Sequence, residues 1–218
     1  MTAVAAPRRT RPRSGPASWL ALALLPVGPA AVAVLRVLVP YDTTGSPQEQ
    51  VAAVAAHPGR QSAVLWLGLV AVLTLVPGVV LAGRLTRSVA PRLTAAAMLL
   101  LVPGYLCLTW VFAGDVVVAA VVRAGIPTAD AARVVAAMHP VTAVGTGVFV
   151  VGHVVGTVLL GIALLRSRMV PAWAGWAMAI SQPLHFLAAV ILLLPALDLL
   201  AWSLTAIAMA AVALALSE

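Results

Sequence analysis

The chain has very few charged residues, because only 9% of its 218 residues are Asp, Glu, Lys or Arg. A soluble domain carries about 25% charged residues, which cover a surface that faces water. Hydrophobic residues make up 63% of the chain, so apolar burial is plentiful and a disordered protein is excluded as well. The composition therefore indicates a membrane protein with several spans.

Lysine and asparagine are absent, and cysteine occurs once. The single Cys107 lies in an apolar run, which excludes a disulfide framework and a CxxC motif. The net charge of +7 could suggest a nucleic-acid partner, but the arginines lie in short loops beside apolar segments, where they orient a membrane protein. No phosphate-binding glycine loop, HExxH motif or Ser/His/Asp set is found, so we expect no conventional enzyme chemistry on a soluble substrate. The bilayer is the expected partner, and nucleic acid is not.

Apolar stretches long enough to cross a hydrocarbon core of about 30 Å recur along the chain. The six predicted spans are residues 17–39, 62–83, 93–113, 141–165, 172–194 and 197–216. Because their connections are short, residues 17–218 are predicted to form one all-α, polytopic bundle of three helical hairpins. Residues 1–16 are basic and rich in proline, which predicts a disordered cytoplasmic tail.

The arginines are distributed unevenly between the two sides of these spans. Nine lie on the side of the N-terminus: Arg8, Arg9, Arg11, Arg13, Arg84, Arg87, Arg92, Arg166 and Arg168. The other side holds four: Arg36, Arg60, Arg123 and Arg133. Five of the six carboxylates also fall on that second side. Positive charge gathers on the cytoplasmic side of membrane proteins, so we expect both termini in the cytoplasm of a bacterial inner membrane.

The two longer loops on the predicted outer side resemble each other. Each is predicted to form a short interfacial helix, over residues 47–57 and 128–139, and each helix stops at a His-Pro pair. His57 and His139 correspond within an internal repeat whose copies run in the same direction. Carriers more often contain inverted repeats, which weakens a transporter interpretation. The two histidines either end their helices or form an outer pair that binds metal or senses pH.

Polar side chains inside the membrane gather mainly on the third, fourth and fifth spans. His153 and His185 lie near the middle of the membrane, counting about 1.5 Å per helical residue. The other members of this candidate midplane site are Tyr105, Thr109, Thr146, Thr157, Ser181 and Gln182. Gly152 and Gly156 form a GxxxG pair that favours close packing of helices.

Three interpretations of the midplane site remain open. The polar groups could join helices by hydrogen bonds, or could line a pocket for a small apolar ligand such as a lipid or quinone. His153 and His185 could instead be the axial ligands of a b-type haem. Two ligands do not predict a metal site, and we expect no bound cofactor under the first interpretation. Arg36 and Asp115 fall at similar depth near the outer side, which predicts an ion pair.

Two short motifs, PAWAGW at residues 171–176 and SQPLH at residues 181–185, carry a resemblance that extends over most of the chain. With its general character, they make the chain similar to a family of small multi-pass integral membrane proteins of GC-rich bacteria, defined by topology. The resemblance implies a membrane bundle and no catalytic residue. We therefore expect a non-enzymatic accessory protein or a binder of a small apolar ligand. Besides the bilayer, its expected partner is such a ligand or a larger membrane complex. The alternatives are a membrane redox protein holding haem b or quinone, and a small transporter or channel.

Overall fold

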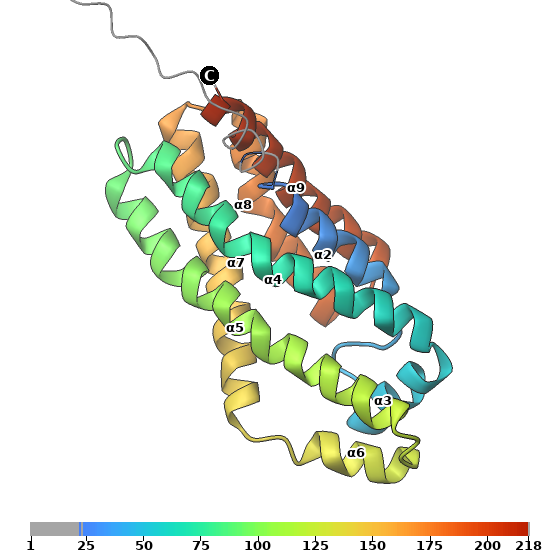
Figure 1. Cartoon of the computed structure of the whole chain (residues 1–218). Coiled ribbons are helices and arrows are strands. Elements are labelled where there is room, and N and C mark those ends of the chain that lie inside the picture. Colours follow the sequence, from blue (N-terminus) through green and yellow to red (C-terminus); the bar gives the residue numbers. More distant parts are fainter. Residues whose placement is uncertain (1–21, 23, 218) are drawn as a thin grey trace, which may run out of the picture.

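The computed structural model describes residue 22 and residues 24–217 of the chain. The predicted tail over 1–16 and the start of the first predicted span lie outside these residues. The described part is all-α, as predicted, and its helices form one elongated bundle (Figure 1). Five of the described helices are long and apolar enough to cross a membrane, so the protein is a multi-pass helical membrane protein.

The long helices correspond closely to the predicted spans. They are α4 (Pro58–Thr86), α5 (Pro91–Arg123), α7 (Val141–Ser167), α8 (Ala172–Phe186) with its π-helical end η1 (Leu187–Ile191), and α9 (Pro195–Ser217). The described part of the predicted span over 17–39 holds α2 (Val27–Leu38), which is apolar but only 12 residues long. Two short helices, α3 (Pro47–Ala56) and α6 (Thr128–Ala136), lie together at one end of the bundle (Figure 1).

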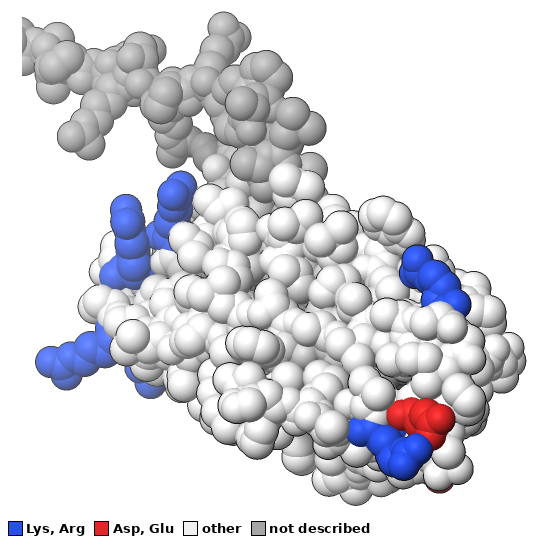
Figure 2. Space-filling model, turned by 60° about the horizontal axis from the view of Figure 1, so that its bottom comes forward, with Lys and Arg blue, Asp and Glu red and all other residues white. Residues whose placement is uncertain are grey.

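The described helices other than α3 and α6 pack in a closed ring that follows their order in the chain. Each packs against the next through α2, α4, α5, α7, α8 and α9, and α9 packs back against α2. We call the two ends of this bundle the α3–α6 end and the arginine-rich end. Five exposed arginines belong to the latter: Arg84, Arg87, Arg92, Arg166 and Arg168. Figure 2 shows a group of blue side chains at one end of the bundle and blue next to red at the other.

Helix α5 extends beyond its predicted end at residue 113. It continues to Arg123, and the chain turns just after it at Gly125, whose φ of +70° is readily adopted by glycine. The extra turns bury Val118 and Val121 against α3 and α6. Asp115 therefore lies within a helix and not in a loop.

Helix α8 ends earlier than the predicted span over 172–194. The π-helical turn η1 follows it, and Leu193 then adopts a φ of +52° before α9 begins at Pro195. The residue before a proline is pushed out of the helical region, which favours a break here. The tight hairpin places Asp198 in the first turn of α9, where it is buried.

Helices α5 and α7 approach each other most closely at two glycines of α7. A Cβ atom at Gly152 would lie 2.6 Å from the carbonyl oxygen of Leu100 and 2.8 Å from the Cα of Gly104. A Cβ at Gly156 would meet the side chain of Leu101 at 2.7 Å. The candidate packing glycines therefore lie where the two helices cross.

The N-terminus of α3 has a capping box that should respond to acid. The Glu49 carboxylate accepts from the Ser46 N–H at 2.7 Å, while the Ser46 hydroxyl accepts from the Glu49 N–H at 3.3 Å. The backbone hydrogen bond from Ser46, followed by the bond from its hydroxyl, lowers the pKa of Glu49 from its usual 4.5. The pKa of Glu49 is lower in the folded chain than in the unfolded chain. The cap therefore stabilises α3 when the pH is above the unfolded pKa, and this stabilisation is lost as the pH falls through the folded pKa.

We therefore expect the hydrogen-exchange protection factors of the α3 amides to fall as pH decreases below 4.5. In Glu49→Gln the amide can still reach the Ser46 N–H but does not titrate, so its α3 protection should stay constant over the same range. An equal fall in both proteins would show that another group controls the stability of α3.

Candidate functional site

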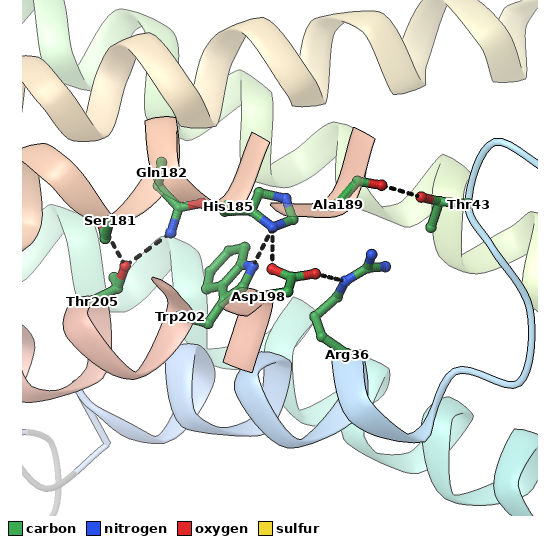
Figure 3. Close-up of polar contacts among 9 residues, drawn as sticks. All are labelled: Arg36, Thr43, Ser181, Gln182, His185, Ala189, Asp198, Trp202 and Thr205. Atoms are coloured by element: carbon green, nitrogen blue, oxygen red, sulfur yellow. Dashed lines mark hydrogen bonds and ion pairs between the residues drawn. The ribbon is translucent and has the colours of Figure 1, made fainter. Parts of the chain in front are cut away.

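A charged cluster forms where α2, α8 and α9 meet near the α3–α6 end (Figure 3). The Arg36 Nε donates to Oδ2 of Asp198, and Oδ1 of the same carboxylate contacts Nδ1 of His185. Only 1% of the Asp198 side chain is exposed, against 17% for Arg36 and 13% for His185. The carboxylate is therefore buried between two basic groups that come from different helices.

Local sequence explains why the charges are tolerated at these helix ends. Arg36 lies in the last turn of α2, where a cation is favoured by the helix dipole. Asp198 lies in the first turn of α9, where an anion is favoured for the same reason. Because α2 and α9 are neighbours with opposite directions, these two ends lie side by side (Figure 1).

The Nδ1 atom of His185 has a second neighbour, because the indole N–H of Trp202 lies 3.1 Å from it. A nitrogen that donates its proton to Asp198 cannot at the same moment accept a hydrogen bond from Trp202. The proton between His185 and Asp198 therefore decides which of the two contacts is a hydrogen bond. His185 is therefore the member of the cluster whose hydrogen-bond partner can change between Asp198 and Trp202.

His153 lies beside His185, so the structure brings together the two histidines predicted near the middle of the membrane. Their ring centroids are 5.4 Å apart. Nδ1 of His153 lies 2.6 Å from the Phe149 carbonyl, which can only accept, so Nδ1 donates and Nε2 carries the lone pair when the ring is neutral. Nε2 is buried and finds no hydrogen-bond partner among the described residues.

A second group of polar side chains joins α8 to α9 on the other side of His185 (Figure 3). Gln182 donates to the Thr205 hydroxyl at 2.8 Å, and Thr205 donates to Ser181 at 2.8 Å. All three residues are buried. Ser181 and Gln182 belong to the predicted site, whereas Thr205 and Asp198 do not. Hydropathy marks residues 197–216 as an apolar span, and Asp198 is counted among the carboxylates on the outer side.

The other predicted members of the midplane site are only partly assembled. Tyr105 lies next to His153, with a ring-centroid distance of 6.4 Å, and Thr157 is buried one turn along α7. Thr109 is exposed and donates to the Leu106 carbonyl of its own helix. Thr146 likewise donates to Thr142 in α7. The hydroxyls of Thr109 and Thr146 thus donate to backbone carbonyls of their own helices and not to the charged cluster.

The ion pair between Arg36 and Asp115, predicted from depth alone, is wrong, because the structure pairs Arg36 with Asp198. Asp115 instead accepts from the Tyr41 hydroxyl and from Nε2 of Gln61 at 3.4 Å. The reason is the ring order, since α9 packs directly against α2 while α5 is separated from α2 by α4. Burial, together with the charge of Asp115, raises the pKa of Tyr41 well above its ordinary value, so this phenol donates as a neutral group.

An open cavity of about 360 Å³ lies beside the charged cluster, between the α8–α9 hairpin, α3 and the loop after α2. Six of its lining residues are polar: Arg36, Tyr41, Asp42, Thr43, Glu49 and Asp198. The others are apolar or glycine: Val39, Pro40, Gly45, Ala53, Ala188, Ala189, Leu193, Leu194 and Pro195. The Thr43 hydroxyl bonds the Ala189 carbonyl at 3.1 Å and so attaches the loop to η1 (Figure 3).

Aromatic and acidic side chains surround the two histidines that could be axial ligands of a haem. An axial imidazole needs an open slot for the macrocycle beside its free nitrogen. Here the ring of His153 stacks on Phe149 at 4.2 Å and lies nearly parallel to Trp202 at 6.0 Å. His185 also directs Nδ1 at Asp198. These contacts do not test the space beyond Nε2 of His153, so haem ligation stays a prediction.

The outer histidines, His57 and His139, lie at helix boundaries. His57 separates α3 from α4, and Nδ1 of His139 accepts from the Val141 N–H at 3.2 Å, just before α7. Both are exposed. Among the described residues, no three His, Cys, Asp or Glu side chains are grouped to hold a metal ion.

Comparisons with protein-family models, with curated proteins and with solved structures find no match for this chain. The function must therefore be argued from the geometry of the cavity and the cluster beside it.

Proposed function

We propose that this protein binds an amphipathic small molecule of the lipid class in the cavity beside Arg36 and Asp198, without chemical conversion. The cavity itself supports this most directly, because both charged and aliphatic residues line it. Such a lining suits a ligand with a polar head and an apolar tail. The sequence predicts a small apolar ligand, whereas the charged residues of this lining favour a ligand with one polar end.

The hairpin beside the cavity supports access from the bilayer. Residues 190–194 are all aliphatic and all substantially exposed, between 39% and 61%. Exposed aliphatic side chains without a neighbouring charge are suited to lipid contact. A lipid tail lying along this hairpin would bring its head to the polar residues of the cavity.

The topology that we propose has six crossings, with the predicted span over 17–39 as the first, of which α2 is the described part. The arginine-rich end is placed in the cytoplasm of a bacterial inner membrane, together with both termini. The cavity then opens toward the outer side. The resemblance to multi-pass proteins of GC-rich bacteria supports the same membrane.

Native mass spectrometry of the full chain, purified in mild detergent with dioleoyl phospholipids, tests this function. We expect one lipid to remain bound to the wild-type protein. Ala53→Trp places an indole in the cavity and should lower retention about tenfold, which corresponds to a loss of about 1.4 kcal/mol of binding free energy. Ala52→Trp, one residue earlier on the exposed face of α3, should retain lipid normally. No retention by the wild type, or equal retention by both variants, would contradict the proposal.

Proton-coupled transport is a second candidate, favoured by the succession of polar groups from the cavity inward. Asp198 contacts His185, and the ring of His185 lies next to that of His153, whose buried Nε2 has no hydrogen-bond partner among the described residues. Intramembrane groups of this kind form proton relays in carriers. Proton uptake into proteoliposomes carrying a pH-sensitive dye, lost in His153→Phe, would support it. If protein-free vesicles took up protons as fast as the proteoliposomes, proton transport by this protein would be excluded.

A further inference from the structure

We infer that the ligand carries a phosphate next to a primary ammonium group, as an ethanolamine-type phospholipid does. This inference rests on the proposed lipid-binding function and specifies the headgroup that the cavity recognises. It follows from the presence of side chains of both charges in the cavity wall.

The phosphate contact is provided by Arg36. Its Nε is used by Asp198, while its two terminal nitrogens point away from that carboxylate, toward the side where Thr43 lies (Figure 3). Arg36 lines the cavity, and only its Nε is used by Asp198, so its terminal nitrogens are the donors that it can offer to a ligand there. A guanidinium offers donors in a planar fork that matches the oxygens of a phosphate. The bond to Asp198 also holds the guanidinium in one orientation before ligand binds.

The ammonium contact is provided by Asp42 and Glu49, which line the same cavity. Both bonds from Ser46 to Glu49 use Oε2, so Oε1 is left for a ligand. The same bonds lower the pKa of Glu49 and keep it ionised at neutral pH. A primary ammonium group donates hydrogen bonds to carboxylates, whereas a trimethylated ammonium has no N–H to donate.

The wall carries charges of both signs, so a headgroup of one sign would leave part of it unpaired. Asp42, Glu49 and Asp198 outnumber Arg36, so a purely anionic headgroup would meet an excess of negative charge. A purely cationic headgroup would leave the terminal nitrogens of Arg36 without an anion. A zwitterion satisfies both signs, and its acyl chains can lie along the exposed Leu193 and Leu194.

Competition between lipids of identical acyl chains tests this. The full chain is incubated with equal amounts of dioleoyl phosphatidylethanolamine, phosphatidylcholine and phosphatidylglycerol, and the bound lipid is identified by native mass spectrometry. We expect phosphatidylethanolamine to be retained about three- to fivefold over each competitor, the range expected for exposed ionic contacts. The variant Asp42→Asn/Glu49→Gln should lose this preference while still binding lipid.

The matched control is Asp130→Asn, which removes an exposed carboxylate that pairs with Arg133 on α6, outside the cavity. It should keep the wild-type preference. Equal retention of phosphatidylglycerol by the wild type, or an unchanged preference in the double variant, would overturn the headgroup assignment and leave lipid binding intact. Failure of the wild type to retain any lipid would instead reject the proposed function.

Discussion

Replacing Asp198 with alanine is expected to lower the free energy of unfolding by about 3–5 kcal/mol. The substitution leaves the Arg36 guanidinium and His185, both largely buried, without the carboxylate between them. Two basic groups would then face each other in a region of low polarity, with no anion to compensate them. Titration with SDS in mixed micelles, followed by tryptophan fluorescence, measures the change.

Asp130→Ala is the matched control for this prediction. It also removes the acid of an ion pair, but Asp130 and Arg133 are 49% and 80% exposed. Exposed pairs contribute about 0–1 kcal/mol, so we expect a small effect. If Asp198→Ala cost no more than Asp130→Ala, Asp198 would not be the charged centre of the cluster.

Replacing Gly152 with alanine should destabilise the protein by about 1–3 kcal/mol, the usual cost of overpacking a close interface. The new methyl group would lie 2.6 Å from the Leu100 carbonyl oxygen and 2.8 Å from the Cα of Gly104. Both atoms belong to the backbone of α5 and cannot rotate away. The two helices would have to separate, and this would also displace His153, the next residue on α7.

Gly147→Ala on the same helix should have the opposite sign. A Cβ at Gly147 meets nothing within 4 Å, so only the gain in helix propensity remains, about 0.5–1 kcal/mol of stabilisation. The same SDS titration compares the two variants. A stabilising effect of both would show that α5 and α7 are not in backbone contact at Gly152.

The cluster and the cavity share one carboxylate, and this connects the proposed binding to the buried histidines. Asp198 lines the cavity while it contacts His185. A phosphate that draws the Arg36 guanidinium toward the cavity would weaken its bond to Asp198. The carboxylate would then depend more on His185. If the proposed ligand binds, the hydrogen bonding of His185 would therefore respond to it through the Asp198 carboxylate.

The sequence by itself determined the elements and their approximate ends. Apolar length predicts the long helices, because a hydrocarbon core accepts only segments whose backbone is satisfied internally. Prolines mark the starts of α3, α4, α5 and α9, where a missing N–H costs nothing. His153 and His185 were identified because they are the two histidines placed inside the predicted spans.

Only the tertiary structure decided which polar groups meet. Arg36 and Asp198 are 162 residues apart, and the sequence suggested Asp115 as the partner because it compared only depth along each helix. Depth does not reveal which helices are neighbours or which face each presents. Those choices depend on the fit of small and large side chains, such as Gly152 against the backbone of α5. In an almost uniformly apolar chain, hydropathy carries no information about that fit, so the pairing at Asp198 and the cavity beside it emerge only from packing.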